Sequence, residues 1–573
     1  MTRNLPRPQR PTWLLSAWMP AALPLCLAAC APTAPPAPTA ASTIARPGPL
    51  QQCTELAARF AHPRTQITGA DWVAEGKMQV AGQPVPEHCL VSGRMNERTS
   101  PVDGQSYAIG FQMRLPKAWN GRFFHQGNGG LDGILVDALG LASGGGPSTS
   151  ALQQGFAVLS SDAGHNLRQL PLFGRDPQAR LDYGYQAVGA LTPMARQLIA
   201  SAYGRGPDRS YFGGCSNGGR HALVAAARYG EQYDGILAGN PGIQLPKAAV
   251  AQLYGAQQFA TVATSNDLAS ALTPPERQLV ARQVLARCDA LDGLTDGLVQ
   301  DTAACQKAFD IQRDVPTCAQ ARDGSCLSAD QKAVLSRIFS GPRGSDGQPL
   351  YAPFPHDAGI AGADWASWKF VSSITNRDPV AVAYVFQTPP ASPEAAKDPR
   401  AIAMNFDIAR DARTIYASDA TYTEAAMSFM PPPASDLGAL KRHGGKLMVY
   451  HGVADGVFSA LDTAAWYQGL QQAHANMAAD FARLYLVPGM NHCRGGPATD
   501  QFDMLPALVA WVEQGQAPER VLAQARGAGN AVPNTELPAG WAAHRSRPLC
   551  PFPKVARYLG SGDTERAESF ECR

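Results

Sequence analysis

Three short stretches carry the residue types that nucleophilic catalysis requires. The first, Gly214-Cys215-Ser216-Asn217-Gly218, is a Gly-x-Ser-x-Gly motif between an apolar run and a helical pattern at 221–229. Glycines on both sides of a serine permit the sharp strand-to-helix turn that exposes its hydroxyl. The motif therefore predicts Ser216 as a nucleophile; a plain glycine-serine loop is the alternative in a chain with 55 glycines.

A serine nucleophile needs a base to take its proton and an acid to orient that base. Asp455 follows the apolar run 446–450 and His492 follows the apolar run 483–487, so each lies just beyond a predicted strand. The order serine, aspartate, histidine is that of α/β-hydrolases and predicts Ser216, Asp455 and His492 as the catalytic set. Three other histidines fit this order less well as the base: His451, His165 and His125.

The glycine-rich loop 126–130 lies upstream of the serine motif and follows a predicted strand. In α/β-hydrolases a loop at this position and the residue after the nucleophile each donate a backbone N–H to the oxyanion. We therefore expect an oxyanion hole formed by Gly130 and Asn217. A flexible loop without a catalytic role is the alternative for Gly130.

Alternating strands and helices must position these residues. Apolar or alternating runs predict strands at 105–115, 156–160, 235–239, 446–450 and 483–487, and a helix is expected at 183–203. This alternation predicts an α/β-hydrolase fold with a mostly parallel, doubly wound sheet and ligands at the carboxyl ends of its strands. We expect the hydrolase core in 51–241 and 434–573. A large inserted lid is expected in 242–433, where the alternation stops.

The N-terminal segment has the features of an export signal. Arginines at positions 3, 7 and 10 precede an apolar run from 13 to 29 that is short and interrupted by prolines. Residues 27–30, Leu-Ala-Ala-Cys, indicate a lipoprotein signal in which Cys30 is acylated; an ordinary signal peptide is the alternative. We expect 1–29 to be removed and 30–50 to form a proline-rich tether. The protein would then lie in the periplasm, on the outer membrane or outside the cell.

The charge balance bears on which partners the protein could bind. Lys and Arg number 49 against 47 Asp and Glu, with no basic tract, so we exclude nucleic acid. The oligomeric state is not determined by the sequence.

The cysteines indicate an oxidising compartment. Of twelve cysteines, Cys26 lies in the signal peptide and Cys30 is the expected acylation site, and the ten that remain predict five disulfides. Sequence alone leaves the pairing open, but proximity suggests four pairs and leaves a remainder: Cys53–Cys89, Cys288–Cys305, Cys318–Cys326 and Cys550–Cys572, with Cys215 and Cys493 left over. A bridge between the last two would join the loops of the predicted nucleophile and base; two buried free thiols are the alternative.

These motifs resemble the tannase and feruloyl esterase family over residues 51–573. The similarity is carried by Gly-Cys-Ser-Asn-Gly-Gly at 214–219, His-Gly-Val-Ala-Asp at 451–455, Pro-Gly-Met-Asn-His-Cys at 488–493 and the long lid. The resemblance implies hydrolysis of esters of aromatic acids through an acyl-enzyme, with a disulfide beside the catalytic residues. A catalytically silent surface binding protein and a secreted peptidase on the same fold are the alternatives.

The resemblance also implies a structural metal in the lid. Residues 289–298, Asp-Ala-Leu-Asp-Gly-Leu-Thr-Asp-Gly-Leu, combine three carboxylates with glycines. Ca²⁺ takes about six to eight oxygen ligands, and members of the family carry a calcium at this motif. The implied ligands are the side chains of Asp289, Asp292 and Asp296 and the carbonyl groups of Leu294 and Leu298. Ordinary Asp-Gly turns are the alternative.

Matching the family's motifs suggests an apolar slot for an aromatic ring, lined by Leu245, Trp368, Phe386 and Phe458. A ring that bears a second, free carboxylate would also need a cation, because a buried unpaired anion is costly. Arg377 is the only arginine between Trp368 and Phe386, where the lid is shorter than in family members that act on terephthalate monoesters. We expect activity on such a monoester with only a weak preference for the free carboxylate. Esters of plant phenolic acids are the alternative substrates, and Arg377 as a surface charge is the alternative role.

Overall fold

The computed structural model of the protein describes residues 44–50, 52–141, 149–344, 346–431 and 437–573. The described residues from 44 onward form one compact unit, so the inserted segment packs with the core. The predicted signal peptide, Cys30 and the tether up to residue 43 lie outside the described residues. The end of the predicted tether is part of the folded unit, because β1 (Gly48–Pro49) pairs with β7 (Ala118–Trp119) and Leu50 is buried.

A nine-stranded sheet forms the centre of this unit. Its parallel part has the spatial order β13 (Ala482–Val487), β12 (Lys446–Gly452), β11 (Gly235–Gly239), β10 (Arg209–Cys215), β8 (Arg122–Gly127) and β9 (Ala157–Ser161). Antiparallel strands extend the sheet beyond β9: β6 (Ser106–Pro116), β5 (His88–Thr99) and β2 (Thr65–Val73). The mostly parallel sheet confirms the predicted fold class, whereas β2 and β5 are not among the predicted strands.

Alternation of side chains along the parallel strands builds a core on each face of the sheet. Tyr211 points to one face, where the core includes α17 (Leu505–Gln514). Phe212 points to the other, where the core includes α4 (Asn217–Arg228) and α16 (Ala460–Ala473). A third cluster packs α3 (Ala187–Tyr203) against the antiparallel strands. Helices therefore cover both faces, as a doubly wound sheet requires.

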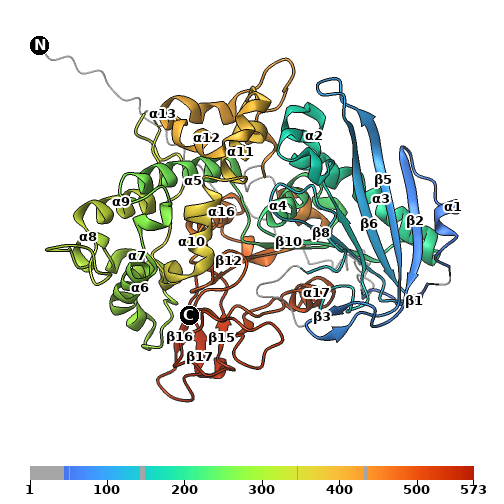
Figure 1. The fold of residues 1–573 in the computed structure, drawn as a ribbon. Helices are drawn as coiled ribbons and strands as arrows, with labels where there is room; N and C mark the ends of the chain where they lie inside the picture. The colour runs from blue at the N-terminus through green and yellow to red at the C-terminus, as the bar shows by residue number, and fades with distance from the viewer. Residues whose placement is uncertain (1–43, 51, 142–148, 345, 432–436) are drawn as a thin grey trace, which may run out of the picture. The chain divides into compact units, whose positions relative to one another are not determined.

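The insertion between β11 and β12 is mainly helical. Figure 1 shows it from green to orange, on the side of the molecule opposite the blue antiparallel strands. Its helices are α5 (Leu245–Ala260), α6 (Pro274–Cys288), α7 (Thr302–Ala308), α8 (Ile311–Asp314), α9 (Ala329–Ser340), α10 (Ala363–Ser367), α11 (Asp378–Val380), α12 (Pro399–Asn405), α13 (Ile408–Asp411) and α14 (Ala426–Phe429). Its apolar cluster extends to Val457 and Phe458, so the insertion shares a core with the loop of the predicted acid.

Local signals explain where the longer helices begin and end. α6 starts after Thr273, which forms a capping box with Glu276, and Pro274 occupies the first helical position. α3 ends at Gly204, whose φ of 76° suits a glycine at a helix C-terminus.

The remaining elements are short. They are helices α1 (Leu56–Arg59), α2 (Pro177–Leu181) and α15 (Gly438–His443), and the strand pairs β3 (Gln79–Val80) with β4 (Gln83–Pro84), β14 (Val521–Gln524) with β15 (Ser546–Leu549), and β16 (Ala556–Tyr558) with β17 (Phe570–Cys572). The five predicted disulfides are confirmed: Cys53–Cys89, Cys215–Cys493, Cys288–Cys305, Cys318–Cys326 and Cys550–Cys572. Among the described helices, none has both the length and the apolar character that a membrane crossing requires.

Candidate active site

Ser216 lies on a sharp turn between β10 and α4 and has a backbone φ of 66°. A non-glycine residue in this region is strained, so the surrounding structure must hold it there. The flanking glycines permit close packing, because a Cβ on Gly214 or Gly218 would lie 2.5 or 2.3 Å from the carbonyl oxygen of Gly127. The glycines of the motif therefore let two strand ends and the start of α4 meet at the serine.

The structure brings Ser216, His492 and Asp455 together from the ends of three strands. Oγ of Ser216 lies 2.8 Å from Nε2 of His492, and Nδ1 of His492 lies 2.8 Å from Oδ2 of Asp455. Ser216 and His492 are 8% and 9% exposed, whereas Asp455 is 2% exposed. In this arrangement a carboxylate can fix the imidazole tautomer while the imidazole accepts the serine proton.

Asp455 is surrounded by hydrogen-bond donors. Its Oδ1 accepts from the N–H groups of the two residues at 457 and 458, and its Oδ2 accepts from the side chain of Asn240 at 2.7 Å. Burial alone would raise the pKa of this carboxyl. The pKa is nevertheless held well below its usual range by His492 and His451, through their charge and their hydrogen bonds to it. Asp455 is therefore a carboxylate at neutral pH.

The three alternative bases occupy other positions. His451 lies 3.3 Å from Oδ2 of Asp455 and is thus a neighbour of the acid. His125 and His165 are buried, and burial lowers the pKa of the first to about 3 and of the second to about 4. The geometry therefore favours His492 as the base.

The loop after β8 passes beside the nucleophile. A Cβ on Gly129 would lie 3.9 Å from Cβ of Ser216, and Gly130 follows with a φ of 67°, which glycine adopts without strain. Asn217 begins α4, is 1% exposed and contacts this loop through its side chain. The loop and the start of α4 therefore meet at the position where the sequence predicts the oxyanion hole.

The loop of the histidine is held from several directions. The Cys215–Cys493 disulfide joins it to the nucleophile across 278 positions. The N–H of His492 donates to Oδ2 of Asp364 on α10 at 3.0 Å. The side chain of Asn491 donates to one carbonyl oxygen of the insertion and to one of the acid's loop. The position of the imidazole is thus fixed by the core and the insertion together.

Trp368 and Phe458 flank the imidazole of His492. Their ring centroids lie 4.9 and 5.4 Å from that of His492, and each ring makes an angle of 80° with it. The guanidinium of Arg377 lies over both rings, 4.9 Å from the centroid of Trp368 and 5.5 Å from that of Phe458. It also pairs with Asp378, whose pKa is raised by burial to about 6 although the arginine opposes that rise. An aromatic surface with a cation over it therefore lies beside the predicted base.

Leu245 and Phe386 lie deeper than these two rings. They are 2% and 1% exposed and belong to the same apolar cluster as Phe458. Leu245 begins α5, and Phe386 ends a π-helical segment at 381–386. Their contact with a substrate stays a prediction.

The acidic loop, which comprises residues 289–298, follows directly after α6. Asp289 and Asp292 are 5% and 2% exposed, and Oδ2 of Asp292 has no hydrogen-bond partner among the described residues. Burial, together with the nearby charges of Asp296 and Asp289, raises the pKa of Asp292 to about 7. Asp296 pairs with Arg547. Within the described residues no three His, Cys, Asp or Glu side chains form a cluster that could hold a metal ion, so the calcium site stays a prediction.

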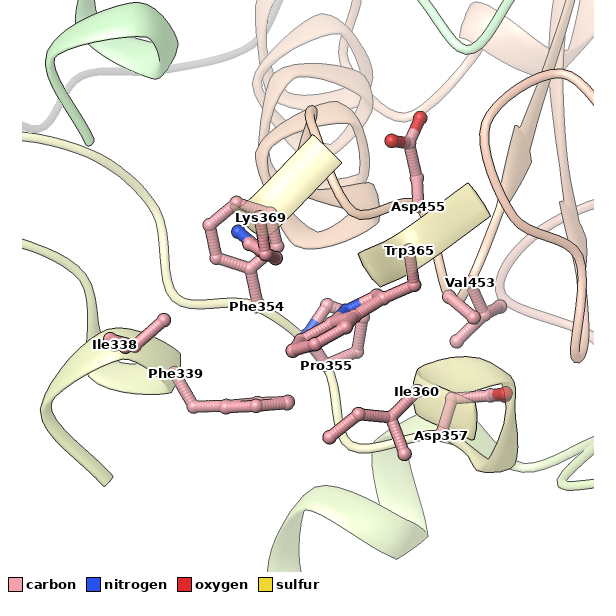
Figure 2. Close-up of a pocket in the computed structure, with 11 residues that line it drawn as sticks. Ile338, Phe339, Phe354, Pro355, Asp357, Ile360, Trp365, Lys369, Val453 and Asp455 are labelled. Carbon is pink, nitrogen blue, oxygen red and sulfur yellow. The ribbon is translucent and has the colours of Figure 1, made fainter. Parts of the chain in front are cut away.

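Two buried residues of the insertion support the loop of the acid, and the sequence gives no signal for them. Gln252 on α5 donates to two carbonyl oxygens just after Asp455, at 3.1 and 2.9 Å, and Nζ of Lys369 donates to Oε1 of Gln252 at 3.3 Å. Lys369 and Asp455 line a cavity of about 10 Å³ whose walls are mostly apolar (Figure 2). Burial lowers the pKa of Lys369 to about 7, although the charge of Asp455 opposes this. Isolated polar residues within a helical segment form no pattern from which this role could be predicted.

The chain is similar to characterised and solved proteins over most of its length. The tannase and feruloyl esterase family model matches residues 89–573. The chain is 40% identical over 545 residues to mono(2-hydroxyethyl) terephthalate hydrolase of Piscinibacter sakaiensis, covering 89% of this chain and 88% of that one. It is 28% identical to a protein described as probable feruloyl esterase B-2 of Aspergillus flavus, covering 72% and 76%.

Two solved structures share the fold. Feruloyl esterase B from Aspergillus oryzae superposes with a TM-score of 0.72 at 24% identity, covering 91% of this chain and 99% of that one. Tannin acyl hydrolase from Aspergillus niger superposes with a TM-score of 0.66 at 19% identity, covering 91% and 96%. The chain therefore belongs to the tannase and feruloyl esterase family of carboxylic ester hydrolases.

Proposed function

We propose that the protein hydrolyses small esters of aromatic acids through an acyl-enzyme on Ser216, with His492 as general base and Asp455 as its orienting acid. The observation that carries this proposal is the continuous contact from Ser216 through His492 to Asp455, with 2.8 Å at each step. A serine hydroxyl is a weak nucleophile until an adjacent base can take its proton.

In the first half-reaction Oγ of Ser216 transfers its proton to Nε2 of His492 and forms a bond to the ester carbonyl carbon. The carbonyl oxygen becomes an oxyanion that the N–H groups of Gly130 and Asn217 stabilise. When the tetrahedral intermediate collapses, the bond to the alcohol breaks and the imidazolium returns its proton to the leaving alkoxide. The acid remains bound to Ser216 as an ester.

In the second half-reaction water replaces the alcohol. His492 takes a proton from the water, and the oxygen attacks the acyl carbon to give a second oxyanion. Collapse breaks the bond to Ser216, which recovers its proton from His492, and the free acid leaves. Asp455 keeps its charge throughout and holds the imidazole in one orientation.

The substrate we propose is a monoester of terephthalic acid such as mono(2-hydroxyethyl) terephthalate. The similarity to a hydrolase of that name supports this choice. A planar ring would lie against Trp368 and Phe458, and its free carboxylate would approach Arg377. The pairing of Arg377 with Asp378 means that a substrate carboxylate must share the guanidinium, which supports only a weak preference for it. Feruloyl and galloyl esters are the second candidate substrates, favoured by the similarity to feruloyl esterases.

We also propose that the acidic loop holds a structural Ca²⁺. Its residues fit such an ion, because buried carboxylates with raised pKa values, and the Asp292 oxygen that lacks a partner among the residues the structure describes, gain from a nearby cation. The ligands would be Asp289, Asp292 and Asp296 with the carbonyl oxygens of Leu294 and Leu298. When bound, the ion would neutralise these charges and stabilise the loop.

Export remains a proposal as well. Five disulfides are typical of a chain that folds in an oxidising compartment. This supports removal of residues 1–29. We further propose that Cys30 is acylated. Mass spectrometry of the mature N-terminus tests both.

A panel of terephthaloyl, feruloyl, galloyl and p-nitrophenyl esters with a peptide amide tests the function. We expect ester turnover that falls by about 10⁵-fold in Ser216→Ala. Ser210→Ala is a matched control, because Ser210 lies on the strand that leads to Ser216 and its buried hydroxyl has no hydrogen-bond partner among the described residues. Ligand binding without turnover would favour a silent binding protein, and amide cleavage a peptidase.

A further inference from the structure

Asn217 contacts the loop on both sides of Gly130. Its Nδ2 donates to Oδ2 of Asp132 at 2.8 Å and to the carbonyl oxygen of Asn128 at 3.4 Å. Gly129 and Gly130 are exposed, so their own packing does little to fix them. The side chain of Asn217 therefore connects the two ends of the segment that carries one predicted oxyanion donor, while its backbone is the other donor.

The amide of Asn217 is held in one orientation by opposite charges. Nε of Arg220 donates to Oδ1 of Asn217 at 2.7 Å, while Nδ2 of Asn217 faces the carboxylate of Asp132. A guanidinium only donates and a carboxylate only accepts, so a flipped amide would lose both hydrogen bonds. Arg220 in turn donates to the carbonyl oxygens of Tyr183 and Gly184, at 2.8 and 2.7 Å, which anchors it to the π-helical turn at 182–186.

This network is buried and costly to assemble. Asp132, Asn217 and Arg220 are 6%, 1% and 0% exposed, and Asp132 has a φ of 57°. A buried carboxylate on a strained backbone persists only where its partners compensate for the cost. Here Nε2 of His221 lies 2.9 Å from the same Oδ2, and Arg220 supplies the countercharge.

We propose that Asn217, held between Arg220 and Asp132, is the positioning residue that sets the distance between the two oxyanion donors. This inference rests on the proposed function. Asp132 is the second positioning residue, because it fixes the loop end that follows Gly130. Oxyanion stabilisation depends on donors placed before the reaction begins, so a loop free to move by 1 Å would lose much of it.

Replacing the side chain while keeping the backbone donor tests this. In Asn217→Ala we expect kcat to fall by about 10²-fold with little change in KM, the effect of losing one oxyanion donor. Inhibition by phenylboronic acid, whose boron binds Oγ of the serine and becomes tetrahedral, should weaken by a similar factor. Inhibition by the product acid, which forms no tetrahedral adduct with Ser216, should stay within about twofold.

Thr192→Val is the matched control for loss of a buried polar group. The hydroxyl of Thr192 contacts His125, Tyr233 and the carbonyl oxygen of Val188, none of which belongs to the network. We expect this variant to lower the melting temperature without the selective loss of boronate affinity.

Asn217→Asp gives a second test that keeps the shape of the side chain. Its carboxylate would face that of Asp132, and two carboxylates at hydrogen-bond distance share one proton. The shared proton holds the loop at low pH and is lost as pH rises, so the ratio of variant kcat to wild-type kcat should fall with increasing pH. Other titratable or charged groups around the pair are present in both proteins and cancel in this ratio: Arg220, His221, Tyr183, Asp162, His165 and His125.

Asp132→Ala combined with Asn217→Ala completes the design. If the two residues act as one spacer, the double variant should lose no more than the worse single variant. A folded Asn217→Ala enzyme with kcat and boronate affinity within threefold of wild type overturns the inference. Turnover that survives in Ser216→Ala would instead overturn the proposed function, so the two failures are distinguishable.

Discussion

Asp455 and Asp292 are the same residue type at the same exposure of 2%, yet their pKa values move in opposite directions. Burial favours the neutral form of both. Two histidines overcome that effect at Asp455, where Asn240 and two backbone N–H groups donate as well. Asp292 receives one backbone N–H on Oδ1, and its neighbours Asp296 and Asp289 are also anionic. The catalytic centre therefore surrounds its carboxylate with hydrogen-bond donors and histidines, whereas the acidic loop places carboxylates beside one another.

The sharpest test of this contrast removes each charge in turn. Asp455→Asn should lower kcat by about 10⁴-fold, because the amide favours the wrong imidazole tautomer. Asp292→Asn should leave kcat within about twofold, because its loop takes no part in acyl transfer. Steady-state kinetics on one ester compares the two variants directly. A large loss of rate in Asp292→Asn would show that the two regions are coupled.

A disulfide lies beside each region, and the two bridges should differ in what they protect. The chain-entropy model gives about 6 kcal/mol for the Cys215–Cys493 bridge, which spans 278 positions, and about 3 kcal/mol for the Cys288–Cys305 bridge, which spans 17. We expect paired Cys→Ala changes at the first bridge to lower both the melting temperature and kcat, and those at the second to lower the melting temperature alone. Calorimetry and kinetics on both variants measure this. Unchanged kcat after loss of the first bridge would mean that hydrogen bonds suffice to position His492.

The acidic loop should make stability depend on pH and calcium together. The pKa of Asp292, about 7 in the folded protein, lies above the unfolded value of about 4. Between about pH 4 and 7, without metal, the folded state holds a proton on Asp292 that the unfolded state has released. The stability that this proton contributes is fully present below about pH 4 and is lost as pH rises through about 7. In chelator, Asp292→Asn should therefore melt about 2–3 °C above wild type at pH 8 and near it at pH 4.

Calcium supplies the control for this experiment. Excess Ca²⁺ should raise the melting temperature of wild type and not of Asp292→Asn, because binding to the native state alone stabilises it. Other buried carboxyls, such as Asp162, also have a raised pKa, so the difference between variant and wild type is the quantity to measure. Equal calcium responses in both proteins, or metal analysis that finds no calcium in purified protein, would contradict the site.

The residues that form the site differ in how well the sequence predicts them. Ser216, Asp455 and His492 each lie a few residues or less beyond the end of a strand, so local pattern predicts both the strands and the residues beyond their ends. Gln252 donates to the acid's loop from 204 positions away in the chain, and Lys369 donates to Gln252 from 117 positions away. No local pattern encodes these contacts. Contacts of this kind come from tertiary packing.

The sheet shows the same limit. β2 and β5 are long and antiparallel, but they carry mixed polar and apolar side chains and their exposed faces blur the alternation that predicts a strand. The Cys215–Cys493 pair, in contrast, could be inferred because both cysteines adjoin residues that chemistry had already brought together.

The smallest effect we expect concerns Arg377, whose surroundings resemble neither those of Asp455 nor those of Asp292. Its countercharge Asp378 is buried, and its Oδ2 has no hydrogen-bond partner in the described part of the chain, so the pair is satisfied only in part. A substrate carboxylate would add a second anion to one guanidinium and gain less than from a free arginine. We expect kcat/KM for a terephthalate monoester to exceed that for its methyl ester by about tenfold, equivalent to about 1.4 kcal/mol, and Arg377→Ala to abolish the difference. Arg377→Lys is the matched variant, since it keeps the charge and loses the planar fork. The same ratio in wild type and Arg377→Ala would mean that the guanidinium only covers the rings of Trp368 and Phe458.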